Sequence, residues 1–193
     1  DILRDISPVD IAQALDANKI AFATLLSTLP HATLHNEPGL LWFETCIASS
    51  VFNGVLQTQL ETEQLPMAIE RVFTHFQHRN LPFEWYLGPG SQHGNIGDLL
   101  KAHGMSQDED EPGMGADLHT LNADKTEASN LIIHPVLTEN QVHQWSRTTY
   151  CGAPENEIYN VFTVYSSLPR GLQSPLHLYL GTIDDHPVVT AAL

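Results

Sequence analysis

Apolar residues recur at helical spacing in two segments of the first half of the chain. The first segment, 8–29, follows Ser7-Pro8, a capping hydroxyl and a proline that are typical of a helix start. The second segment, 65–79, places Ile69, Val72 and Phe76 on one side and ends before Asn80. The pattern therefore predicts two amphipathic helices.

Shorter apolar runs around these helices are typical of strands. The predicted strands cover 40–43, 51–60, 83–87 and a short stretch near 114–118. A short helix is expected over 96–103, before Gly104. Residues 31–37 are polar, and we expect a loop there.

The second half of the chain begins after a polar, charged segment, 122–129, that has no apolar periodicity and is expected to be a linker. The elements predicted beyond it are a strand over 131–136, a helix opened by the capping-box pattern of 138–141, a helix over 155–168 and a hairpin over 176–193. These elements predict a mixed α/β protein with two domains, 1–121 and 130–193.

The last predicted strand has an apolar side chain at almost every position from Val188 to Leu193. Strands of this kind are usually covered on both faces. We therefore expect packing on both faces of this strand and a neighbour on its free edge.

The net charge of the chain disfavours partners that are themselves negatively charged. With 23 acidic and 8 basic residues, the formal net charge is -15. Such a field repels nucleic acids and anionic membrane surfaces, and we expect neither as a partner.

The first residues lack the layout of a signal peptide. Cys46 and Cys151 form no CxxC pair, which favours a reducing cytoplasm over a disulfide framework.

Metal and phosphate motifs are weak in this sequence. Among its 11 histidines, His75 and His78 lie three residues apart and His31 and His35 four apart, and neither pair has a third ligand nearby in sequence. We predict no metal site, because zinc needs three or four convergent ligands. The glycine-rich loop 88–94 has the wrong spacing for a dinucleotide fingerprint and is expected to be a structural turn.

Four aromatic residues gather on the two predicted helices beside the loop 151–154. They are Trp145, Tyr150, Tyr159 and Tyr165. Aromatic residues at helical spacing usually belong to a core, and the alternative is a wall that faces a substrate.

The order of elements after residue 130 resembles the opening of the GCN5-related N-acetyltransferase (GNAT) family. Residues 130–141 resemble the family's first strand and helix entry, and 179–192 resemble the hairpin that follows its second helix. The resemblance implies a next strand and a Gln/Arg-x-x-Gly-x-Gly/Ala loop that binds the pyrophosphate of acetyl-coenzyme A. We expect the cofactor-binding and catalytic groups beyond Leu193, and none in this chain.

The first domain resembles a degenerate copy of the same fold, so the chain is similar to tandem-domain members of the family. The helix 65–79, the strand 83–87 and the helix 96–103 follow the family's order in its second half. The segment before that helix, 59–64, has no glycine and carries Glu61 and Glu63. These acids would repel a pyrophosphate, so this copy is not expected to bind the cofactor.

The resemblance implies that the complete C-terminal domain transfers an acetyl group from acetyl-coenzyme A to an amine acceptor, a small molecule or a peptide. The chain would then supply the acceptor wall, with Trp145, Tyr150, Tyr159 and Tyr165 as substrate-binding candidates. The alternative is a non-catalytic, acidic module that binds a protein or a small basic ligand.

Overall fold

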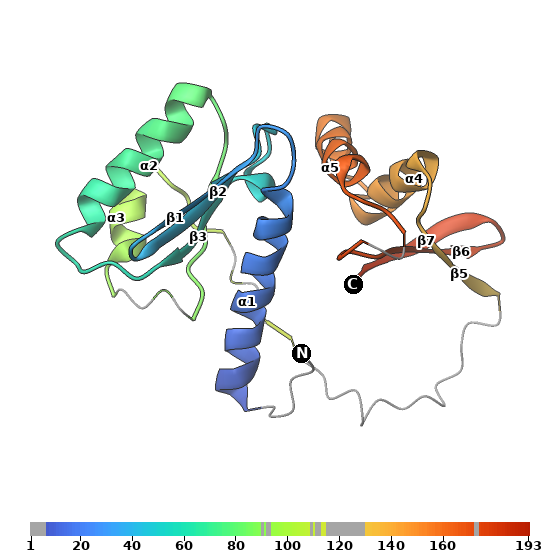
Figure 1. Cartoon of the computed structure of the whole chain (residues 1–193), viewed down its shortest axis with the longest axis horizontal. Helices are drawn as coiled ribbons and strands as arrows, with labels where there is room; N and C mark the ends of the chain where they lie inside the picture. The colour runs from blue at the N-terminus through green and yellow to red at the C-terminus, as the bar shows by residue number, and fades with distance from the viewer. Residues whose placement is uncertain are drawn as a thin grey trace. The chain divides into compact units, whose positions relative to one another are not determined.

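The computed structural model describes residues 7–89, 91, 94–108, 110, 113, 114, 130–171 and 174–193. The chain divides into two compact units, Asp1–Leu121 and Asn122–Leu193. Both units combine helices with a sheet, so the fold is mixed α/β (Figure 1). The expected linker and all but Met114 of the strand expected near 114–118 lie outside the described residues.

The first unit builds a four-stranded sheet in the order β1-β2-β3-β4. Its elements are α1 (Pro8–Leu26), β1 (Thr33–Glu37), β2 (Leu40–Glu44), a 3₁₀ turn (Ser50–Phe52), β3 (Gly54–Thr58), α2 (Leu65–Arg79), β4 (Glu84–Trp85) and α3 (Ile96–Ala102). β1, β2 and β3 pair antiparallel, whereas β4 pairs parallel to β3 after the crossover through α2. The predicted bounds of α2 are confirmed, while β3 and β4 are shorter than predicted.

The strand β1 lies where the sequence pattern predicted a loop, so that prediction was wrong. It pairs with β2 from Thr33 opposite Glu44 to Glu37 opposite Leu40. Pro38 and Gly39 make the turn between them, and Gly39 has a φ of +76°, which glycine adopts without strain. Because β1 is an edge strand with no fully buried position, its sequence has no apolar alternation.

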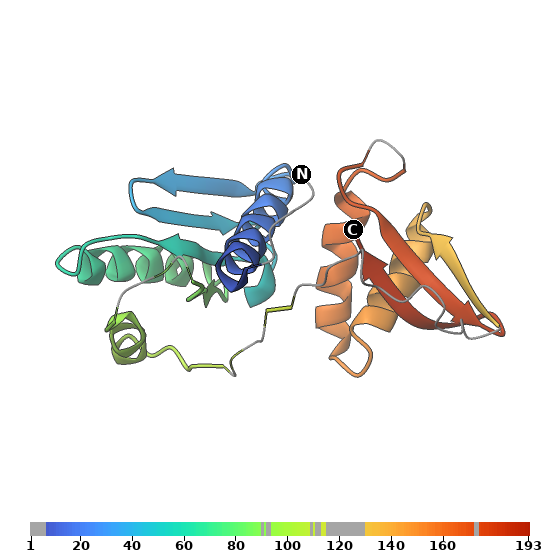
Figure 2. The same cartoon turned by 90° about the horizontal axis from the view of Figure 1, so that it is seen from below.

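Both faces of β2 are covered, and all five of its residues are buried. Leu40 and Trp42 belong to a core with Ile69, Val72 and Phe76 of α2, which runs along the sheet (Figure 2). On the other face, Phe43 and Leu56 meet Phe22 and Ala23 of α1 around a small pocket. The sheet around β2 is therefore the middle layer between α2 on one face and α1 on the other.

The second unit is a three-stranded antiparallel sheet with two helices. Its elements are β5 (Leu131–Pro135), α4 (Glu139–Thr149), α5 (Glu155–Ser167), β6 (Leu178–Ile183) and β7 (His186–Ala192), in the sheet order β5-β6-β7. The predicted capping box is confirmed, because Thr138 and Gln141 bond each other's backbone at the start of α4. Asp184 and Asp185 both have positive φ in the tight turn between β6 and β7.

One face of this second sheet packs against helices and the other is open. The hydroxyl of Thr149 on α4 donates to that of Thr190, 2.9 Å away, which places α4 on the Thr190 face. Ile133 and Val189 both pair with Gly181, so their side chains lie on the opposite face, where they are 62% and 45% exposed. Within the part of the chain that the structure describes, β7 is therefore covered on one face only, whereas we expected cover on both.

A buried asparagine ties the 3₁₀ turn of the first unit to its sheet. The side-chain amide of Asn53 donates to the carbonyl oxygens of Ile47 and Ser49 at 2.7 and 2.8 Å, and it lies 3.2 Å from that of Pro82. Its oxygen accepts from the N–H of Thr45 at 2.9 Å. One side chain thus satisfies backbone groups from two loops and the end of β2.

We predict that Asn53→Ala lowers the free energy of unfolding by about 2–4 kcal/mol, because it leaves several buried backbone groups without partners. Urea denaturation monitored by circular dichroism measures the change. The matched control is Asn36→Ala at an exposed position of β1, for which the expected change is below about 0.5 kcal/mol. Equal effects of the two substitutions would contradict the role assigned to Asn53.

Candidate functional site

A pocket of about 300 Å³ opens in the second unit where the C-terminal end of α5 meets β5 and β6. Most of its wall is apolar. Its lining includes Val136, Leu137, Tyr165, Leu168, Arg170 and His177. A mostly apolar cavity of this size with a few polar groups is typical of a small-molecule site.

Tyr165 is the one predicted aromatic residue among those that line this pocket. Burial, and to a lesser degree the neighbouring Tyr150, raises the pKa of Tyr165 to about 12. The ring of Trp145 lies 4.7 Å from the ring of Tyr165, and its Nε1 donates to the carbonyl of Ala191 at 3.3 Å. Trp145 thus supports Tyr165 and joins α4 to β7.

The fourth predicted aromatic residue lies elsewhere. Tyr159 is 66% exposed, and its ring centre is 6.4 Å from that of Phe162. The fold therefore brings Trp145 and Tyr150 close to Tyr165 and leaves Tyr159 outside the pocket lining. The spacing of residues predicted which side chains share a helix face, but it did not predict which face lines the pocket.

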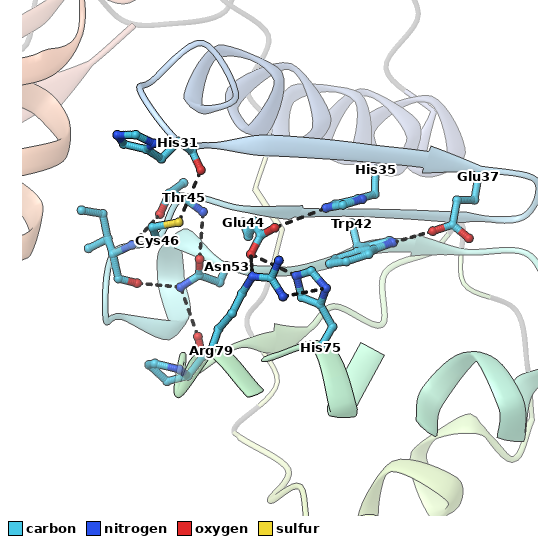
Figure 3. A network of polar contacts seen from close by, with 12 residues as sticks. His31, His35, Glu37, Trp42, Glu44, Thr45, Cys46, Asn53, His75 and Arg79 are labelled. Carbon is cyan, nitrogen blue, oxygen red and sulfur yellow. Dashed lines mark hydrogen bonds and ion pairs between the residues drawn. The ribbon is translucent and has the colours of Figure 1, made fainter. Parts of the chain in front are cut away.

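The first unit contains a buried carboxylate among basic side chains. Glu44, at the end of β2, is 5% exposed and shares with Leu40 and Trp42 the sheet face that α2 covers. Its neighbours are His35 from β1, and His75 and Arg79, one turn apart on α2 (Figure 3). Strand alternation and helix periodicity together aim these side chains at one point.

The distances within this cluster are short. His75 Nε2 lies 3.0 Å and Arg79 Nε 3.1 Å from Glu44 Oε2, while His35 Nε2 lies 3.5 Å from Oε1. His35 stacks on Trp42 with ring centres 3.6 Å apart, and His75 meets the same indole edge-on at 4.6 Å. The ligand atoms of His35, Glu44 and His75 all lie within 4.8 Å of one another.

Three buried atoms of the cluster lie close together, but their contacts do not have the angles of hydrogen bonds. His35 Nε2, His75 Nε2 and Glu44 Oε2 are buried, and none makes a hydrogen bond to another described residue. The contacts to Glu44 are therefore ion-pair contacts by distance alone. Burial lowers the pKa of His35, and His75 lowers it further, although the nearby Glu44 opposes this shift.

The prediction of no metal site rested on the lack of a third ligand beside either histidine pair. The fold takes one histidine from each pair, His35 and His75, and joins them to Glu44. The turn dipeptide Pro38-Gly39 was the available signal, because a hairpin there places His35 beside Glu44. The loop 88–94, expected to be a structural turn, lies partly outside the described residues.

Comparison of the chain with protein-family models, curated proteins and solved structures finds no match. Within the described ranges, no helix has both the length and the apolar content to cross a bilayer. The cysteines Cys46 and Cys151 are free and exposed.

We predict that Tyr165 ionises with a pKa of about 12, well above the usual tyrosine value of 10.0. Because the folded pKa exceeds the unfolded one, Tyr165 stabilises the fold below pH 10, and this contribution is lost as the pH rises to about 12. Spectrophotometric titration should show a late phenolate step that Tyr165→Phe removes. Tyr159→Phe is the control and should leave that step in place, and a late step that survives Tyr165→Phe would contradict the assignment.

Proposed function

We propose that residues 130–193 form the acceptor side of an N-acetyltransferase of the GNAT type, which transfers an acetyl group from acetyl-coenzyme A to an amine. The observation that carries this proposal is the topology of the second unit. A strand, two helices and an antiparallel hairpin follow in that order, with β5 paired to β6 and β6 paired to β7. This order and pairing are what the resemblance to the family implies.

The free edge of β7 supports the same proposal. His177 and Leu193 exchange two backbone hydrogen bonds at 2.8 and 2.9 Å. The alternation of an antiparallel ladder then directs the N–H and C=O groups of Thr190 and Ala192 towards the free edge. An apolar strand with such an edge favours pairing with a further strand. We propose that this strand belongs to the same protein and leads to the loop that binds acetyl-coenzyme A.

The pocket beside α5 would hold the acceptor. Tyr165 and the apolar side chains around it can enclose the carbon skeleton of an amine, and Trp145 fixes the position of Tyr165. A free amine is mostly protonated at neutral pH, and the net charge of -15 favours its approach. The same charge disfavours the approach of coenzyme A unless a local basic site compensates it.

The reaction requires the acceptor nitrogen in its neutral form. A base or a water chain removes its proton, the nitrogen attacks the thioester carbonyl, and a nitrogen–carbon bond replaces the carbon–sulfur bond. Backbone amides polarise the carbonyl oxygen, and the sulfur of coenzyme A leaves and takes up a proton. We place these groups in sequence other than the described residues.

The first unit would support the enzyme without binding its cofactor. The crossover from β3 through α2 to the parallel strand β4 supports the resemblance to the family's second half. The turn before α2 carries Glu61 and Glu63, and Gln64 makes no side-chain cap at the helix start. Carboxylates at this position disfavour a pyrophosphate.

We predict that the 193-residue chain does not bind acetyl-coenzyme A with micromolar affinity, whereas the chain extended by the sequence that follows Leu193 in the encoding gene does. Isothermal titration calorimetry on both proteins measures this. Saturable micromolar binding by the 193-residue chain would show that the cofactor site is misplaced. Binding by neither protein would instead support the non-catalytic interaction module.

A further inference from the structure

We propose that His35, Glu44 and His75 form a binding site for a divalent transition-metal ion such as Zn²⁺. The site lies in the first unit, and it does not depend on the acetyltransferase proposal (Figure 3). The three side chains come from β1, β2 and α2, so the folded unit assembles the site.

The chemistry of the donor set fits such an ion. Two imidazole nitrogens and one carboxylate oxygen are the protein ligands of many zinc sites that keep a further coordination position open. The same set also binds iron(II) and related metals. Calcium and magnesium prefer oxygen ligands, so two histidines favour zinc and its neighbours.

The spacing of the donor atoms also fits. Ligands about 2.1 Å from a tetrahedral zinc ion lie about 3.4 Å from one another. His75 Nε2 is 3.0 Å from Glu44 Oε2, and His35 Nε2 is 3.5 Å from Glu44 Oε1. All three donor atoms lie within 4.8 Å of one another, so the widest pair has to close by at most about 1.4 Å around a tetrahedral ion.

The missing hydrogen bonds argue for a ligand at this point. One buried atom from each of the three side chains makes no hydrogen bond of good geometry, although His75 Nε2 and His35 Nε2 lie within ion-pair distance of the Glu44 carboxylate. A cation that accepts a lone pair from each atom would satisfy all three at once. The ring positions are already fixed, because His35 stacks on Trp42 and Trp42 Nε1 donates to Glu37 at 3.0 Å.

Arg79 is the competitor of the metal ion in this arrangement. Its Nε lies 3.1 Å from Glu44 Oε2, and its Nη1 lies 3.3 Å from His75 Nδ1. A guanidinium only donates, so this contact makes His75 Nδ1 the acceptor and leaves the ring proton of a neutral His75 on Nε2. Metal binding requires the proton on Nδ1 instead, so Arg79 has to move away. Its side chain is 48% exposed and can turn towards solvent.

The test uses the complete 193-residue chain, produced without a histidine tag. Zn²⁺ is titrated in competition with a chromogenic chelator, and Co²⁺ absorption in the visible range reports the coordination. We expect one equivalent to bind, and we expect His75→Gln and Glu44→Gln each to weaken binding at least about 10-fold. Arg79→Gln should strengthen it, because the substitution removes the competing cation.

His78→Gln is the matched control, since this histidine lies on the same helix but outside the cluster. It should bind the metal as the unchanged chain does. Thermal unfolding of each variant checks the fold, and the half-buried His35→Gln provides a second ligand variant if Glu44→Gln is unstable. Equal affinities of His75→Gln and His78→Gln, or no saturable binding by the unchanged chain, would overturn the proposal. A loss of stability in Arg79→Gln without tighter metal binding would identify the cluster as an ion-pair network and would also overturn it.

Discussion

The burial of the Glu44 carboxylate is the constraint around which the first unit is arranged. An ionised carboxylate that is only 5% exposed needs cations or hydrogen-bond donors in contact with it. The β1–β2 hairpin supplies His35, and α2 supplies His75 and Arg79 across the same face of the sheet. The position of α2 on the sheet and the register of the hairpin therefore determine whether this charge is compensated.

The second unit has the opposite imbalance, because apolar surface remains exposed there. Ile133 and Val189 lie on a sheet face that no described element covers, and β7 has a free edge. Large exposed apolar patches usually mark surfaces that contact another element or molecule. The acetyltransferase proposal accounts for this face, for the free edge and for the pocket at Tyr165 by one additional strand and the segment after it.

Local sequence signals predicted much of the fold. The apolar spacing of α2, the capping box at Thr138 and the hairpin at Asp184-Asp185 each depend on residues that are close in sequence, and each is present in the structure. The strand β1 was missed because it is a polar edge strand. The cluster around Glu44 was missed because its ligands come from three elements, and sequence spacing carries no information on such contacts.

The most direct test of the site at Glu44 is a crystal structure of the chain grown with Zn²⁺, with anomalous diffraction recorded on both sides of the zinc absorption edge. We predict an anomalous peak within about 2.1 Å of His35 Nε2, His75 Nε2 and a carboxylate oxygen of Glu44. Arg79 should then point away from Glu44. A map without a peak at this position, in which Arg79 keeps its contact to Glu44, would contradict the proposed metal site.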